Sequence, residues 1–269
     1  MNREYYKFRG KGKRNYQNQK KKKKQKRLWI FLLILFCIAA IATIWYSRQC
    51  EIRKLPAYTE SDGSGSIVDK SPDSIPEYAG EAVIELNDGI PCFTDLDLEH
   101  ISGENYSPLD FLGRCGTAVA MLDRTMMPAE ERGLIGDIKP SGWIQKKYPG
   151  IIDSEPPYLY NRCHLIAYAM TGQNANTENL ITGTEYLNTS SMLPYEKQVL
   201  RYLDDSDNHV LYRVSPYFKD LELVARGVEI EAYSVEDHGA GSCFHVFIYN
   251  IQPGIEIDYQ TGESWIKEE

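Results

Sequence analysis

The middle of the chain reads YNRCHL at residues 160–165 and places three reactive side chains next to one another. Arg162 carries a permanent positive charge, Cys163 a thiol, and His164 an imidazole whose usual pKa of about 6.5 lets it accept a proton at neutral pH. Such residues suit a nucleophile, a metal site or a general base. Residues elsewhere in the chain must decide among these chemistries.

A cysteine nucleophile is the weakest of these interpretations. Adjacent residues on an extended strand point to opposite faces, so the Cys163 thiol and the His164 imidazole would not share a proton. Cys163 is therefore expected to pack inward as a small apolar residue. A zinc site is also disfavoured, because neither a C-x-x-C nor an H-x-x-x-H spacing occurs. His209 and His245 lie in strand-like segments and are expected to be packing or surface residues.

Two polar residues downstream of the histidine favour the general base. Asn188 follows His164 by 24 residues, and Glu196 lies eight residues further, within LPYEKQV. The series of NRCH, Asn188 and Glu196 resembles the DNA/RNA non-specific endonucleases of the ββα-metal (His-Me finger) class. Their pattern is D-R-G-H, then an asparagine, then a glutamate on the next helix.

The resemblance extends well beyond these residues. KPSGW at 139–143 and YNIQPGIEIDYQTGES at 249–264 look like segments that flank the site in that family. Similarity of this kind covers roughly residues 80–264. The combined pattern is specific, whereas the four-residue motif alone would be weak.

Two residues depart from the family pattern. Asn161 stands where the family has aspartate, and Cys163 stands where it has glycine. Asn161 still forms hydrogen bonds, but it brings no charge to raise the basicity of His164. Cys163 requires a backbone conformation that is open to residues other than glycine. Both changes are expected to tune the site without removing the reaction.

The resemblance implies how the site residues divide the work of phosphodiester hydrolysis. His164 is expected to take the proton from the attacking water, and Arg162 to grip a phosphate oxygen. A Mg²⁺ ion, for which Mn²⁺ is a substitute, is expected to bind the Asn188 side-chain oxygen directly and Glu196 through water. Glu196 is thereby counted among the catalytic residues. Arg132 is the preferred second phosphate contact. The other basic candidates are Arg114, Lys139, Lys146, Lys147 and Arg201.

The elements that must position these residues follow an α+β pattern. AVIEL at 82–86 alternates like a strand, and a helix is expected to begin around Pro194. Strand-like alternation follows in residues 209–253, in three segments that favour an antiparallel sheet. The expected fold is α+β, with a ββα-metal core on an antiparallel sheet flanked by helices. This nuclease domain is expected over residues 80–265, preceded by one transmembrane helix.

The N-terminal residues are not globular. Residues 1–27 hold 13 Lys/Arg and one acidic residue, which predicts a basic cytoplasmic tail. Residues 28–46 carry no charge, and a helix of that length spans roughly 28 Å. A membrane anchor is therefore expected there, with the rest of the chain outside the cytoplasm. Residues 47–79 have linker composition. The alternative is a signal peptide, whose cleavage would leave the protein secreted.

The chain beyond the anchor is strongly acidic. Residues 47–269 hold 17 Lys/Arg and 37 Asp/Glu, a net charge of about −20 that repels polyanions in bulk. Binding of DNA or RNA therefore requires a local group of cations or a metal ion. Loop length also permits a disulfide between Cys92 and Cys115 in an oxidising compartment.

Two functions compete at this point. The first is a membrane-anchored, extracytoplasmic, metal-dependent endonuclease that acts on DNA and RNA with little sequence preference, because contacts to the phosphate backbone carry no base information. The second is a surface receptor that binds nucleic acid without cleaving it, with Asn161 and Cys163 as marks of a decayed site. Binding without cleavage distinguishes the second from the first.

Overall fold

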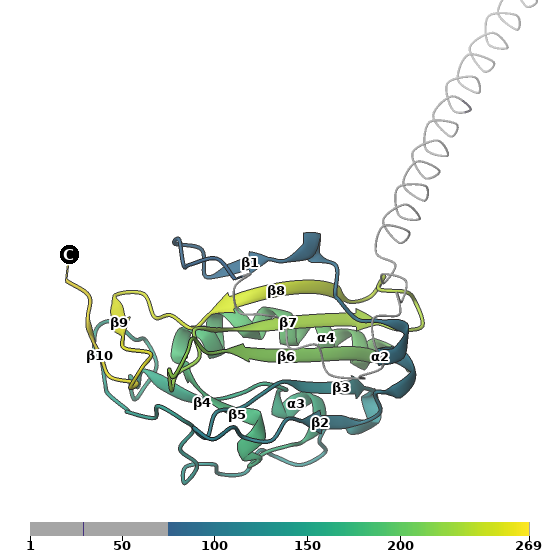
Figure 1. Ribbon diagram of the computed structural model, residues 1–269. Helices are drawn as coiled ribbons and strands as arrows, with labels where there is room; N and C mark the ends of the chain where they lie inside the picture. Colours follow the sequence, from purple (N-terminus) through teal and green to yellow (C-terminus); the bar gives the residue numbers. More distant parts are fainter. Residues whose placement is uncertain (1–28, 30–74, 269) are drawn as a thin grey trace, which may run out of the picture. The chain divides into compact units, whose positions relative to one another are not determined.

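A six-stranded antiparallel sheet forms the centre of the fold in the computed structural model, which describes Trp29 and residues 75–268 (Figure 1). The strands run in the order β1-β8-β7-β6-β3-β2. Their bounds are β1 Val83–Glu85, β2 Glu104–Tyr106, β3 Ala118–Leu122, β6 Val210–Tyr217, β7 Gly227–Ser234 and β8 Cys243–Tyr249. The antiparallel sheet that we expected from the alternation in residues 209–253 is confirmed by β6, β7 and β8.

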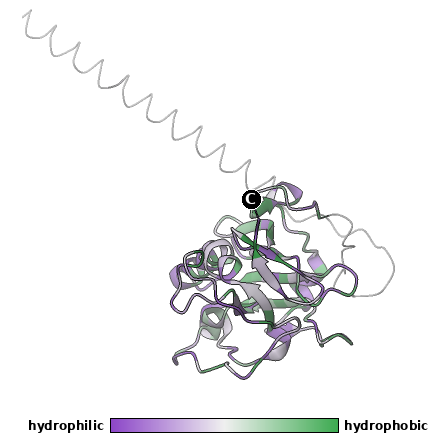
Figure 2. Ribbon diagram, turned by 90° about the vertical axis from the view of Figure 1, so that its left-hand side faces the viewer, coloured by the Kyte–Doolittle hydropathy of each residue, from purple (hydrophilic) through white to green (hydrophobic). Residues whose placement is uncertain are grey.

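Alternation of side chains gives this sheet two different faces. One face shares a core with helix α4 (Leu193–Asp205), in which Ile230 and Val246 of the sheet and Val199 of the helix are buried together. The other face carries a second, smaller core that contains Phe93 and Leu211. In Figure 2 the strands include much of the hydrophobic, green part of the chain, and the connecting loops are largely purple.

A separate hairpin carries the histidine. Strand β4 (Tyr160–His164) pairs antiparallel with β5 (Leu180–Thr184), so that His164 lies opposite Leu180 at one end. This two-stranded sheet is distinct from the six-stranded one.

A continuous helical run follows β5. It passes through a π-helical turn, η5 (Leu187–Met192), directly into α4. Pro194 lies in the first turn of α4, directly after the π-helical turn. Two strands and the helix after them therefore form the ββα arrangement expected around His164.

The remaining elements are short. They are α2 Asp95–His100, α3 Tyr168–Thr171, β9 Ile255–Ile257, β10 Ser264–Ile266 and the 3₁₀ turns η2 Asn87–Gly89, η3 Arg124–Met126 and η4 Thr177–Asn179. The expected basic tail, linker and anchor lie almost wholly outside the described residues. No helix among the described residues has both the length and the apolar character that a bilayer crossing requires.

Candidate active site

The imidazole of His164 is held on both of its nitrogens. The residue is 6% exposed at the end of β4. Its Nε2 lies 3.0 Å from the carbonyl oxygen of Asn174, and its Nδ1 lies 3.2 Å from Nη2 of Arg132. A carbonyl can only accept and a guanidinium can only donate, so Nε2 carries the hydrogen and Nδ1 presents its lone pair. Nδ1 is therefore the basic atom of the site.

Burial keeps this imidazole neutral. The pKa of His164 is lowered to about 4, chiefly by burial. The hydrogen bond to the Asn174 carbonyl acts against this shift, and the positive charge of Arg132 adds to it. A general base must be unprotonated before the reaction, and His164 meets that condition across the neutral range.

The carbonyl that orients His164 comes from the loop after α3. That helix ends at Gly172, which adopts a left-handed conformation with φ of 72°. Residues with a β-carbon rarely take this conformation, whereas glycine takes it freely. The turn leads into the segment that presents the Asn174 carbonyl to Nε2.

Glu196 is the acidic partner in this group. It lies half-buried in the first turn of α4. Burial raises the pKa of Glu196 to about 7, while the positive charge of Arg132 lowers it. Arg132 therefore acts electrostatically on both His164 and Glu196, and these three side chains form one charged cluster.

Asn188 lies eight residues before Glu196 on the same helical run, within the π-helical turn. Turns of this kind occur frequently at functional sites. Neither the Asn188 nor the Glu196 side chain forms a hydrogen bond or ion pair with another described residue. A partly buried carboxylate and an amide oxygen that no protein donor satisfies are ligands that a hydrated Mg²⁺ ion accepts. The residues present therefore fit the metal that the sequence led us to expect.

Cys163 packs into the core. It is 1% exposed, and its Sγ lies 3.5 Å from Sδ of Met192. The space for it comes from Gly183 on β5, where an added β-carbon would lie 2.6 Å from Cβ of Cys163. Burial raises the pKa of the Cys163 thiol, which therefore stays protonated. The expectation that Cys163 packs inward is confirmed.

Arg162 holds a neighbouring loop. Its Nε and Nη2 donate to the backbone carbonyls of Ile138 and Gly136. Its Cζ lies 4.3 Å from the ring centroid of Trp143, so the guanidinium stacks on the indole. Two of the five N–H groups are thus used within the protein, and the phosphate contact that we expected of Arg162 stays a prediction.

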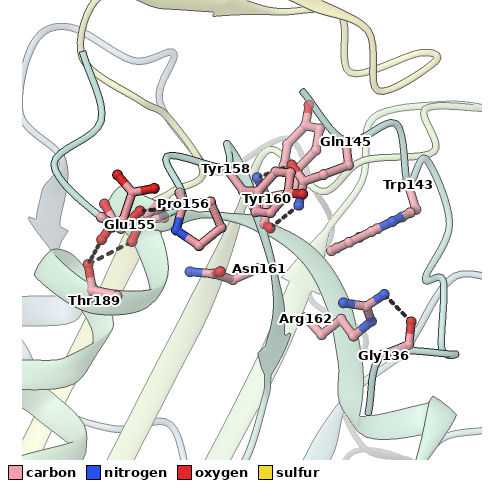
Figure 3. A pocket seen from close by; sticks show the side chains of 12 residues that line it. Gly136, Trp143, Gln145, Glu155, Pro156, Tyr158, Tyr160, Asn161, Arg162 and Thr189 are labelled. Atoms are coloured by element: carbon pink, nitrogen blue, oxygen red, sulfur yellow. Dashed lines mark hydrogen bonds between the residues drawn. The ribbon is translucent and has the colours of Figure 1, made fainter. Parts of the chain in front are cut away.

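A pocket of about 740 Å³ opens beside β4 (Figure 3). Asn161 and Arg162 contribute to its wall, and Glu185 and Thr189 come from the start of the helical run. Asn161 forms no hydrogen bond with the His164 ring, whose two nitrogens are bonded to Asn174 and Arg132. The exchange of the family aspartate for Asn161 therefore leaves the direct partners of the base unchanged.

Several other expectations are settled by contacts elsewhere. Arg114 and Lys146, two of the basic candidates, pair with Asp110 and Glu263. The disulfide that loop length permits between Cys92 and Cys115 is not formed, and the thiol of Cys115 instead donates to backbone carbonyls, 3.1 Å from that of Leu180. Cys92 lies on the other face of the sheet, next to His245.

Sequence reasoning missed two partners of the site. The Asn174 carbonyl that orients His164 is a backbone group and leaves no trace in the sequence. The stacking of Trp143 on Arg162 was also not anticipated, although KPSGW had been singled out as a flanking segment. The aromatic Trp143 within KPSGW is the only sequence feature that could have indicated this stacking contact.

Comparison with known proteins gives the site its context. Residues 97–236 match the family described as DNA/RNA non-specific endonuclease. A deoxyribonuclease of Streptococcus dysgalactiae subsp. equisimilis is 32% identical over 110 residues, which are 39% of this chain and 32% of the relative. The chain thus spans about a third of the length of that relative.

Solved structures show the same fold. NucA from Streptococcus agalactiae with a magnesium ion bound superposes with a TM-score of 0.60 at 27% identity, over 69% of this chain and 89% of NucA. The Sda1 nuclease with a bound zinc ion gives a TM-score of 0.52 at 26% identity, over 62% of this chain and 83% of Sda1. Together with the family match over more than half of its length, this likeness means that the chain belongs to the DNA/RNA non-specific endonuclease family.

Proposed function

We propose that this protein is a metal-dependent endonuclease that hydrolyses phosphodiester bonds of DNA and RNA with His164 as its general base. The observation that carries the proposal is the state of the imidazole. Its Nε2–H is bonded to the Asn174 carbonyl, and its Nδ1 lone pair faces the cationic Arg132. Arg132 now occupies this lone pair and lowers the basicity of the ring, so the neutral imidazole can take a proton from water once the phosphate draws the guanidinium away from Nδ1.

The other residues bind and orient the substrate and the ion. Arg132 is exposed and reaches Nδ1, so its remaining donors are available to a non-bridging phosphate oxygen. Arg162 holds the loop at residues 136–138 in place and thereby supports the site. A Mg²⁺ ion, when held by Asn188 and by Glu196 through water, would neutralise charge on the phosphate and on the departing oxygen.

The proposal extends to location. Residues 28–46 are uncharged and follow a basic segment, which supports a membrane anchor with the nuclease domain of residues 80–265 outside the cytoplasm. The net charge of about −20 beyond the anchor supports recognition through a few cations rather than a basic surface. Cleavage is therefore expected to be insensitive to sequence and strongly inhibited by salt.

A cleavage assay with the purified full chain tests the proposal. Supercoiled plasmid, single-stranded DNA and RNA are incubated with Mg²⁺, with Mn²⁺ and with EDTA. Cleavage is expected with either metal and not with EDTA. His164→Ala is expected to reduce kcat by roughly 10²–10⁴-fold, the usual contribution of a general base.

The same assay has an outcome that contradicts the proposal. Tight binding of DNA without cleavage in any metal would identify a non-catalytic receptor instead. Full activity of the His164→Ala variant would remove the histidine from the mechanism.

A further inference from the structure

A second group of metal-binding side chains lies on the face of the sheet that is turned away from α4. It consists of Cys92, Glu231 and His245, whose potential ligand atoms all lie within 4.8 Å of one another. Glu231 on β7 and His245 on β8 are direct partners across the two strands. Cys92 comes from the segment between η2 and α2. None of these residues contributes to the site around His164.

The separation of the atoms suits a tetrahedral cation. Sγ of Cys92 lies 3.9 Å from Nδ1 of His245. Zinc bonds of about 2.3 Å to sulfur and about 2.0 Å to nitrogen place these two atoms roughly 3.5 Å apart. A shift of a few tenths of an ångström in the half-buried Cys92 therefore brings this pair of atoms to the separation that zinc requires.

His245 is oriented as a metal-binding histidine usually is. Its Nε2 lies 2.5 Å from a carboxylate oxygen of Glu229, two residues from Glu231 on the same face of β7. A carboxylate on the far nitrogen fixes the ring and raises its basicity toward a metal. Nδ1 is thereby turned toward Cys92 and toward the backbone carbonyl of Ile90, which lies 3.1 Å away.

Glu231 keeps one oxygen for the cation. Its Oε2 accepts from Nε of Arg213 at 2.7 Å, and this buried ion pair holds the carboxylate in place. Its Oε1 accepts from the backbone N–H of Cys92 at 2.6 Å. The same oxygen lies 3.8 Å from Nε2 of His245. Oε1 is therefore the oxygen of Glu231 that lies close to both Cys92 and the His245 ring.

We propose that Cys92, Glu231 and His245 bind one zinc-like divalent cation, with Glu229 as the residue that positions His245. Thiolate and imidazole ligands select zinc or cobalt over the harder Mg²⁺ expected near His164. The bound cation joins the segment around Cys92 to β7 and β8. Its role is to secure this N-terminal part of the domain on the sheet.

Titration of the full chain with Co²⁺ tests the proposal. Bound metal is first removed with a chelator, and the chelator is then removed. Thiolate bound to Co²⁺ gives a near-ultraviolet charge-transfer absorption that a site made of Asn188 and Glu196 cannot produce. We expect this absorption to saturate at one equivalent, to vanish when Zn²⁺ is added and to persist in excess Mg²⁺. We also expect Zn²⁺ to raise the melting temperature of the wild-type chain.

Matched variants locate the site. Cys92→Ala is expected to abolish the absorption and the zinc-dependent rise in melting temperature, whereas Cys115→Ala, a thiol in the other core, is expected to keep both. Glu229→Gln should keep the absorption but weaken Co²⁺ binding by roughly 10–100-fold. The absence of a charge-transfer absorption in the folded wild-type chain would overturn the proposal. Persistence of the absorption in Cys92→Ala would also overturn the proposal, independently of the result of the nuclease assay.

Discussion

Glu196 is expected to make the affinity for metal depend on pH, whereas kcat at saturating metal should not depend on pH. Burial raises the pKa of this carboxyl to about 7, so that it is largely protonated in the metal-free site at pH 6. Glu196 holds the metal-bound water only in its ionised form, so protonation of the carboxyl opposes metal binding. Below pH 7 the apparent affinity for Mg²⁺ should therefore fall by up to tenfold for each pH unit.

The magnitude follows from the linkage between the two equilibria. Relative to its value at pH 8, the apparent dissociation constant of Mg²⁺ should rise roughly tenfold at pH 6 and roughly a hundredfold at pH 5. His164 behaves differently, because its pKa is lowered to about 4 and it stays unprotonated over this range. At saturating Mg²⁺, kcat should consequently remain nearly constant from pH 8 down to about pH 5.

The assay is a Mg²⁺ titration of the initial cleavage rate at each pH, at constant ionic strength. The control is Glu196→Gln, which cannot ionise and should bind Mg²⁺ weakly with little dependence on pH. An Mg²⁺ constant that does not change between pH 8 and pH 5 in the wild-type chain would refute the role of Glu196. A kcat that falls with a midpoint near pH 6.5 would show that His164 titrates as an ordinary histidine and that the burial argument fails.

Three substitutions test other parts of the site. Arg132→Ala should lower kcat/KM in the cleavage assay by roughly 10²–10³-fold. In a DNA-binding assay it should reduce the slope of log affinity against log salt concentration by about one, and an unchanged slope would argue against a phosphate contact. Gly183→Ala should cost roughly 1–3 kcal/mol in denaturant unfolding, because its β-carbon would lie 2.6 Å from that of Cys163. Adding Cys163→Gly should remove much of this penalty, and simple additivity of the two changes would contradict the packing argument. Arg162→Ala should expose the loop at residues 136–138 to faster proteolysis as well as reduce activity, whereas a pure phosphate contact would leave proteolysis unchanged.

The sheet and the helix of the site were predictable because they follow simple periodicities. Residues 209–253 alternate as strands do, and Pro194 marks the start of α4. The family pattern pointed to His164 and Glu196, and Arg132 acts electrostatically on both side chains, while their roles in the reaction stay predictions. Local pattern and spacing were sufficient for these features.

Contacts between distant segments were not predictable in the same way. Arg132 meets His164 across 32 residues, and Arg162 turns to backbone carbonyls 24 and 26 residues before it. The room for Cys163 is provided by Gly183 on another strand. The search for C-x-x-C and H-x-x-x-H spacings disfavours a zinc site, because such motifs detect only ligands that are close in the chain. Cys92, Glu231 and His245 come from three separate segments.

The hydrogen bond from His164 to the Asn174 carbonyl has a consequence for how the enzyme can change. A backbone acceptor cannot be replaced by substitution at its own position, so the tautomer of the base is insensitive to the identity of residue 174. It is sensitive instead to the path of the chain after α3, which Gly172 directs with its left-handed conformation. A glycine with no reactive group thus helps to position the carbonyl that fixes the tautomer of His164. Variants of this loop should alter chemistry while leaving every reactive side chain in the sequence unchanged.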